Sequence, residues 1–138
     1  MSDIELSDAE RRLRDLLRIW TALFAAGTLS FAMQPDRATG SLGLIPGTAL
    51  EQSSERFWNA LSVSLMATLT ALCGIAASDV RRHRSLILPV LVSKAVSSGM
   101  FLLRFGQQPR RVPYLAGALC DGSILAVTLR HYRAAAGH

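Results

Sequence analysis

Two charged residues stand alone near the middle of long apolar segments in this 138-residue chain. Lys94, the only lysine in the sequence, lies in segment 86–103, and Asp121 lies in segment 112–129. A charge at the centre of a bilayer costs about 2.5–3.5 kcal/mol on insertion scales, so such residues usually pair or serve a function. A lysine and an aspartate together can form an ion pair, relay a proton or anchor a polar ligand.

The elements that position these residues are apolar segments long enough to cross a membrane. Segment 57–77 has 21 residues and no charge, and at 1.5 Å per residue a helix of this length spans a hydrocarbon core of about 30 Å. Segment 19–33 is shorter, but Leu16 and Leu17 precede it and Arg18 can snorkel to the interface. Half of the chain is hydrophobic and 18% is charged, and its length fits one domain, residues 1–138.

We therefore predict an all-α fold: an integral membrane, four-transmembrane-helix antiparallel bundle. The expected helices cover approximately 7–33, 56–78, 86–104 and 112–132, and a long non-cytoplasmic loop, 34–55, joins the first two. The apolar stretch 42–45 in this loop could lie in the headgroup layer, cap the bundle or dock on a partner; a mobile loop is the simpler alternative.

The N-terminal part of the first helix is predicted to be an amphipathic extension outside the apolar layer. The first 15 residues of the chain contain five acidic side chains, which is too acidic for a signal peptide. Ser7 and Glu10 have the spacing of a capping box, which predicts that the helix begins there. The apolar residues of the extension share one face and can lie against a neighbouring helix. They are Leu13, Leu16, Leu17 and Trp20.

Consecutive antiparallel helices place Lys94 and Asp121 at the same depth, and we expect them to lie within reach of each other. Ser97 and Ser98 follow Lys94 by three and four residues and so share its face of the helix. Ser64 and Thr68 share a face of the second membrane helix and could join this polar centre. The expected ligand-binding or buried polar centre is therefore Lys94, Asp121, Ser97, Ser98, Thr68 and Ser64.

The distribution of basic residues predicts the orientation. Nine arginines flank the side of the predicted membrane that holds both chain ends and the 79–85 link, and five flank the other side. This bias predicts a multi-pass protein of the bacterial inner (plasma) membrane with both termini in the cytoplasm. The net charge of +5 then reflects arginines that contact anionic headgroups, and no nucleic acid is expected as a partner.

Residue sets typical of enzymes, metal sites and redox proteins are missing from the sequence pattern. Cys73 and Cys120 form no CxxC motif, and the three histidines all lie outside the apolar segments. No carboxylate–histidine cluster has the i, i+3 or i+4 spacing of a di-iron or zinc site. We therefore expect no catalytic residues, no metal and no cofactor.

Two functions remain open at this point. The first is a non-catalytic accessory subunit or a ligand- or lipid-binding bundle, in which Lys94 and Asp121 fix the fold. Its partners would be the lipid bilayer, a larger membrane complex or further copies of the chain, and a small apolar or amphipathic ligand. The second is a small proton-coupled transporter or exchanger that uses Lys94 and Asp121 as its site. An enzyme is the third choice.

Overall fold

Four long helices and one short 3₁₀ turn make up the part of the chain that the structure describes. This computed structural model describes residues 6–33, 52–107 and 112–136, and for 52–59 only the backbone. The helices are α1 (Asp8–Met33), α3 (Gln52–Ser78), α4 (Ile87–Gln107) and α5 (Val112–Ala136), and the short turn η1 (Arg84–Leu86) precedes α4. The described ranges contain no strand, and the predicted all-α four-helix fold is confirmed.

The helix boundaries follow the predicted ones with extensions at polar ends. The capping box forms as expected: the Ser7 amide donates to Glu10 Oε2 at 2.7 Å, and the Glu10 amide donates to Ser7 Oγ at 3.3 Å. The prediction of a loop through residue 55 was wrong, because α3 already begins at Gln52. An apolar run marks only the part of a helix in an apolar environment, whereas backbone hydrogen bonding continues into polar residues. Residues 34–51, with the stretch 42–45, lie outside the described residues.

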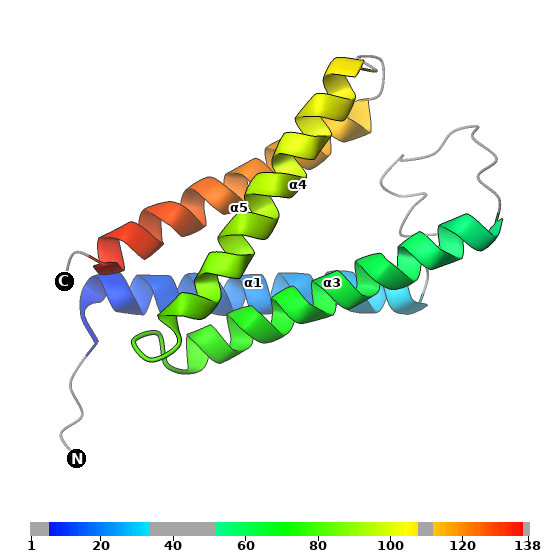
Figure 1. Ribbon diagram of the computed structural model, residues 1–138. Coiled ribbons are helices and arrows are strands. Elements are labelled where there is room, and N and C mark those ends of the chain that lie inside the picture. The colour runs from blue at the N-terminus through cyan, green and yellow to red at the C-terminus, as the bar shows by residue number, and fades with distance from the viewer. Residues whose placement is uncertain (1–5, 34–51, 108–111, 137–138) are drawn as a thin grey trace.

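The four helices form two antiparallel hairpins, α1–α3 and α4–α5 (Figure 1). The hairpins meet at the end that holds the start of α1, the end of α5 and the turn between α3 and α4, and they diverge toward their other ends. Helix α1 contacts α5, and the contacts of α3 with α4 accompany the tight turn that joins them. We call the end where the hairpins meet the closed end, and the other the open end.

The main hydrophobic core is shared by both hairpins. On α1 it contains Leu13, Leu17 and Phe24, of which both leucines are completely inaccessible to solvent. The amphipathic start of α1 thus lies against other helices, as its apolar face predicted. The remaining core residues come from α3, the following turn, α4 and α5: Leu69, Cys73, Ala76, Ala77, Val80, Ile87, Val90, Leu91, Ile124 and Ala135.

All four long helices are long and apolar enough to cross a membrane, which indicates a multi-pass membrane protein. Large apolar side chains cover much of their outward surface, as expected where lipid rather than water is the solvent. The most exposed of them are Ile19, Leu29, Met33, Leu65, Val92, Val96, Val112 and Leu119.

Candidate functional site

The structure places the two isolated charges in direct contact inside the α4–α5 hairpin. Lys94 Nζ lies 2.8 Å from Asp121 Oδ1, within both hydrogen-bond and ion-pair distance. The two side chains retain only 12% and 15% of their exposure, so the protein shields most of each charged group. The contact arises because α4 and α5 are antiparallel and each residue lies near the middle of its helix.

Two serines on the same face of α4 extend this contact. Ser97 donates a hydrogen bond to Asp121 Oδ2, so both oxygens of the carboxylate have a donor. Ser98 donates to the backbone carbonyl of Ala118 on α5 at 2.9 Å. One serine therefore serves the charged pair directly, while the other joins the two helix backbones.

Small residues on α5 allow α4 to approach closely at this level. A Cβ atom on Gly122 would lie 3.2 Å from Ser98 Oγ, and one on Gly117 would lie 3.0 Å from the ring of Phe101. Ala118, between them, is buried. This packing holds the hydroxyl groups of α4 within hydrogen-bonding distance of α5.

An aromatic residue of α1 completes the surroundings of the lysine. Lys94 Nζ lies 4.9 Å from the centre of the Phe24 ring, a distance typical of a cation–π contact. Phe24 stacks with Trp20, whose ring centre is 6.5 Å away. The Lys94 ammonium is thus contacted by both hairpins: by Asp121 from α5 and by Phe24 from α1.

A second polar contact connects the hairpins nearer the closed end. Trp20 Nε1 donates to Thr128 Oγ1 at 3.0 Å, and Thr128 is the only polar residue among the described ones that is buried to this degree. Thr128 follows Asp121 by seven residues, which is about two helical turns, so the two residues lie on the same side of α5. Sequence reasoning did not assign Phe24 or Trp20 to the site, because contacts between helices that are distant in the sequence leave no spacing signal.

The structure does not bring Ser64 and Thr68 to this centre. Both are exposed, and Thr68 Oγ1 donates to the Ser64 backbone carbonyl within α3 at 2.9 Å. The expectation that they join the pair was wrong: both hydroxyl groups lie on an exposed face of α3, and α4 diverges from α3 after the closed end (Figure 1). The polar centre consists of Lys94, Asp121, Ser97 and Ser98.

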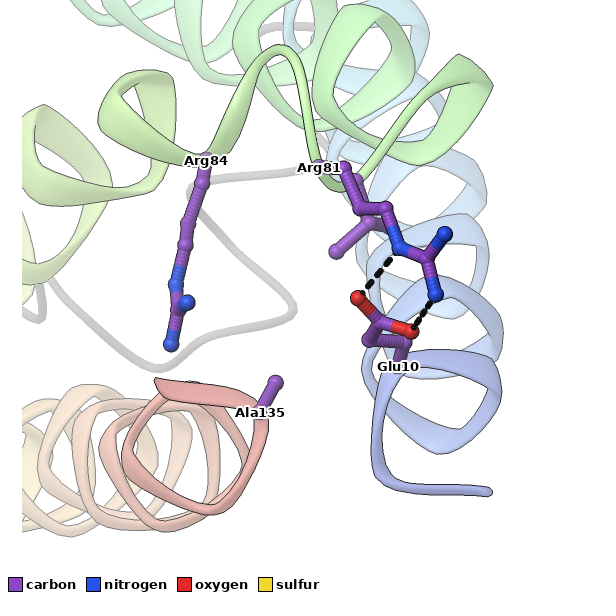
Figure 2. Close-up of a pocket in the computed structure, with 5 residues that line it drawn as sticks. Glu10, Arg81, Arg84 and Ala135 are labelled. Carbon is purple, nitrogen blue, oxygen red and sulfur yellow. Dashed lines mark hydrogen bonds and ion pairs between the residues drawn. The ribbon is translucent and has the colours of Figure 1, made fainter. Parts of the chain in front are cut away.

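A different group of charges gathers at the closed end, outside the apolar parts of the helices. Arg81 binds the Glu10 carboxylate through Nε at 2.6 Å and Nη2 at 2.8 Å (Figure 2). This double hydrogen bond raises the pKa of Arg81 above its usual range. Arg84 Nη2 donates to the Tyr132 carbonyl at 2.8 Å, and its guanidinium lies 4.9 Å from the Tyr132 ring centre. These contacts connect the α3–α4 turn to α1 and α5.

The described residues contain no group of three or more histidine, cysteine or acidic side chains placed to hold a metal ion. Cys73 is buried and Cys120 is exposed, and both are free thiols. No known protein family, curated protein or solved structure matches the chain. The function must therefore be inferred from the chemistry of the chain's own side chains.

Proposed function

We propose that this chain is a small non-catalytic protein of the bacterial inner membrane, with both termini in the cytoplasm. It would act as an accessory subunit of a larger membrane complex, or as a bundle that binds a lipid or another small apolar or amphipathic ligand. The observation that carries the proposal is the contact of Lys94 with Asp121. Both charged groups find their hydrogen-bond and cation–π partners within the chain itself.

The partners of the pair support a structural role. Asp121 accepts from Lys94 and from Ser97, one donor for each carboxylate oxygen. The lysine has the carboxylate on one side and the Phe24 ring on another. A charge that is already neutralised and hydrogen-bonded has little to offer an incoming substrate, but the loss of one partner leaves the other buried without compensation.

The outward surfaces support a role in binding lipid or another protein. Val92 and Val96 on α4 and Val112 and Leu119 on α5 are all at least 60% exposed. They belong to the α4–α5 hairpin, which diverges from α1 and α3 toward the open end (Figure 1). Apolar faces of this kind are covered in a membrane by lipid or by another helix, and either partner fits the proposal.

Native mass spectrometry of the chain, gently released from its own membrane, tests this proposal. An accessory subunit will arrive with larger proteins in a fixed ratio, and a binding bundle will arrive alone or as a small homo-oligomer with a retained lipid or small molecule. A bare monomer that retains nothing at any solubilisation condition would contradict both forms of the proposal.

A second candidate is a small proton-coupled transporter or exchanger. The observation in its favour is that Lys94 and Asp121 keep 12% and 15% of their side-chain exposure, so the pair is not completely sealed. In this case transport in vesicles should depend on pH and should vanish in Asp121→Asn while the protein stays folded. An Asp121→Asn protein that keeps full transport would exclude this function.

A further inference from the structure

The closed end contains a small pocket that the Lys94–Asp121 site does not explain. The pocket has a volume of about 150 Å³ and is lined by Glu10, Val80, Arg81, Arg84 and Ala135. Figure 2 shows Arg84 on one side and the Glu10–Arg81 pair on the other, with Ala135 of α5 between them. Three separate parts of the chain therefore form its wall: the start of α1, the α3–α4 turn and the end of α5.

Arg84 is held in place but keeps an unused donor. Its Nη2 bonds to the Tyr132 carbonyl and its guanidinium lies over the Tyr132 ring, so the side chain is fixed from α5. Its Nε is buried and has no hydrogen-bond partner. The guanidinium carries five N–H donors, so donors besides the one that bonds to Tyr132 can serve an oxygen ligand in the pocket.

The charges of the pocket favour an anion. Both oxygens of Glu10 accept from Arg81, and Glu10 Oε2 also accepts from the Ser7 amide, so this carboxylate is occupied by donors of the chain. The Glu10–Arg81 pair is neutral as a unit, and Arg84 adds a positive charge opposite it. A planar guanidinium binds phosphate oxygens with well-defined geometry, which a lysine ammonium does not provide.

The pocket lies where phosphate groups are found in a membrane protein. The segment that forms one wall, between Ser78 and Arg84, separates two helices that are long and apolar enough to cross a membrane. Such a turn lies at the level of the lipid headgroups, and basic pockets between membrane helices are known binding places for anionic headgroups.

We propose that this pocket binds a phosphate group, with Arg84 as its ligand. The phosphate would come from the headgroup of an anionic phospholipid or from free phosphate, and both share the same recognition by guanidinium donors. The proposal concerns one defined site and differs from a general attraction between arginines and the membrane surface.

Binding to the purified, delipidated full-length chain tests the site. The probes are phosphatidylglycerol, the zwitterionic lipid phosphatidylcholine and inorganic phosphate, each measured by native mass spectrometry. We expect one phosphatidylglycerol per chain to bind in a saturable way, ahead of phosphatidylcholine. Arg84→Ala should weaken this binding about tenfold or more, as expected when a charged hydrogen bond is lost.

Arg82→Ala is the matched control, because it removes the same charge from the same turn and Arg82 does not line the pocket. Equal weakening by Arg82→Ala and Arg84→Ala, or the absence of a saturable site, would overturn the proposal. If Arg84→Ala does not fold, Ala135→Leu replaces it: the larger side chain fills the pocket without changing the charge and should also abolish saturable binding. Undiminished binding by a folded Ala135→Leu protein would equally overturn the proposal.

Inorganic phosphate distinguishes the two sources of the group. If it displaces phosphatidylglycerol from the wild-type chain and fails to bind Ala135→Leu, the site takes the phosphate group itself, free or lipid-bound. If only the lipid binds, and Ala135→Leu loses it, the site is specific for a headgroup held in the membrane.

Discussion

Trp20 and Thr128 are 108 residues apart in the sequence, and a 3.0 Å hydrogen bond joins Trp20 Nε1 to Thr128 Oγ1. This bond connects α1 of one hairpin to α5 of the other, close to where the hairpins meet. Together with the Lys94–Phe24 contact, it makes the side chains of α1 the main link between the two halves of the fold.

The Trp20–Thr128 bond should be measurable by a double-mutant cycle. Thr128→Val preserves the shape of the side chain but leaves a part-buried indole N–H without its acceptor, and should lower the free energy of unfolding by about 1–3 kcal/mol. In a Trp20→Phe background the same change should have a smaller effect, because the donor is gone. Denaturant unfolding in mild detergent provides the measurement, and strictly additive effects would show that the two residues are not coupled.

Removal of either charge of the central pair should destabilise the fold strongly. Lys94→Ala or Asp121→Ala leaves the other charge buried and unpaired, which costs about 3–5 kcal/mol. The double variant Lys94→Leu/Asp121→Leu removes both charges and should recover part of the yield of folded protein. Size-exclusion chromatography after expression gives the comparison, and a double variant as unstable as either single one would contradict a role in fixing the fold.

Ser97 and Ser98 should differ in their contribution despite being neighbours. Ser97→Ala removes a donor from a charged carboxylate and should cost about 1.5–3 kcal/mol, whereas Ser98→Ala removes a bond to a neutral carbonyl and should cost about 0.5–1.5 kcal/mol. Ser123→Ala is the control, because the Ser123 hydroxyl bonds to the Cys120 carbonyl of its own helix. Thermal unfolding of the three variants should rank them in this order, and equal shifts would refute it.

Replacement of glycine by alanine should destabilise the protein at Gly117 of α5 but not at Gly99 of α4. A Cβ at Gly117 would approach three ring atoms of Phe101 to 3.0–3.1 Å, so Gly117→Ala requires the ring to move and should lower the melting temperature. Gly99 has no atom within 4 Å of such a Cβ, and Gly99→Ala should be neutral or stabilising by up to about 1 kcal/mol, the difference in helix propensity. A destabilising Gly99→Ala would indicate that another molecule covers this face.

The proposed orientation is testable by thiol labelling in a background without Cys73 and Cys120. Arg82→Cys, in the exposed α3–α4 turn, should react with a membrane-impermeant maleimide only after spheroplasts are lysed. Gln107→Cys, exposed at the end of α4, should react in intact spheroplasts. The reverse pattern would place both termini outside the cytoplasm and refute the arginine count as a guide.

The sequence was sufficient to predict the helices, because apolar runs of 15 to 21 residues leave few alternatives. The predicted start of α1 was accurate because the Ser7–Glu10 capping box is a local signal. Local spacing also placed Ser97 and Ser98 on the face of Lys94. The contact of Lys94 with Asp121 followed from one further assumption, that consecutive helices are antiparallel.

The arrangement of the two hairpins could not be predicted in the same way. Ser64 and Thr68 have the spacing of a polar face, but each helix can satisfy such hydroxyl groups from its own backbone, as Thr68 does. Phe24 has no feature that marks it as a cation–π partner, because that role depends on the angle at which α1 crosses α4. Helix crossing angles depend on the packing of many side chains, and no single motif encodes them.

The divergence of the two hairpins gives the molecule a wedge-shaped outline (Figure 1). In a bilayer, a wedge takes up more area in the leaflet at its open end than in the leaflet at its closed end. With the closed end on the cytoplasmic side, as proposed, the outer leaflet would be the more crowded one, and regions where the membrane bulges outward would accommodate the protein with the least strain. The angle between the hairpins, set by contacts of Trp20 and Phe24, would thus link side-chain packing to membrane curvature.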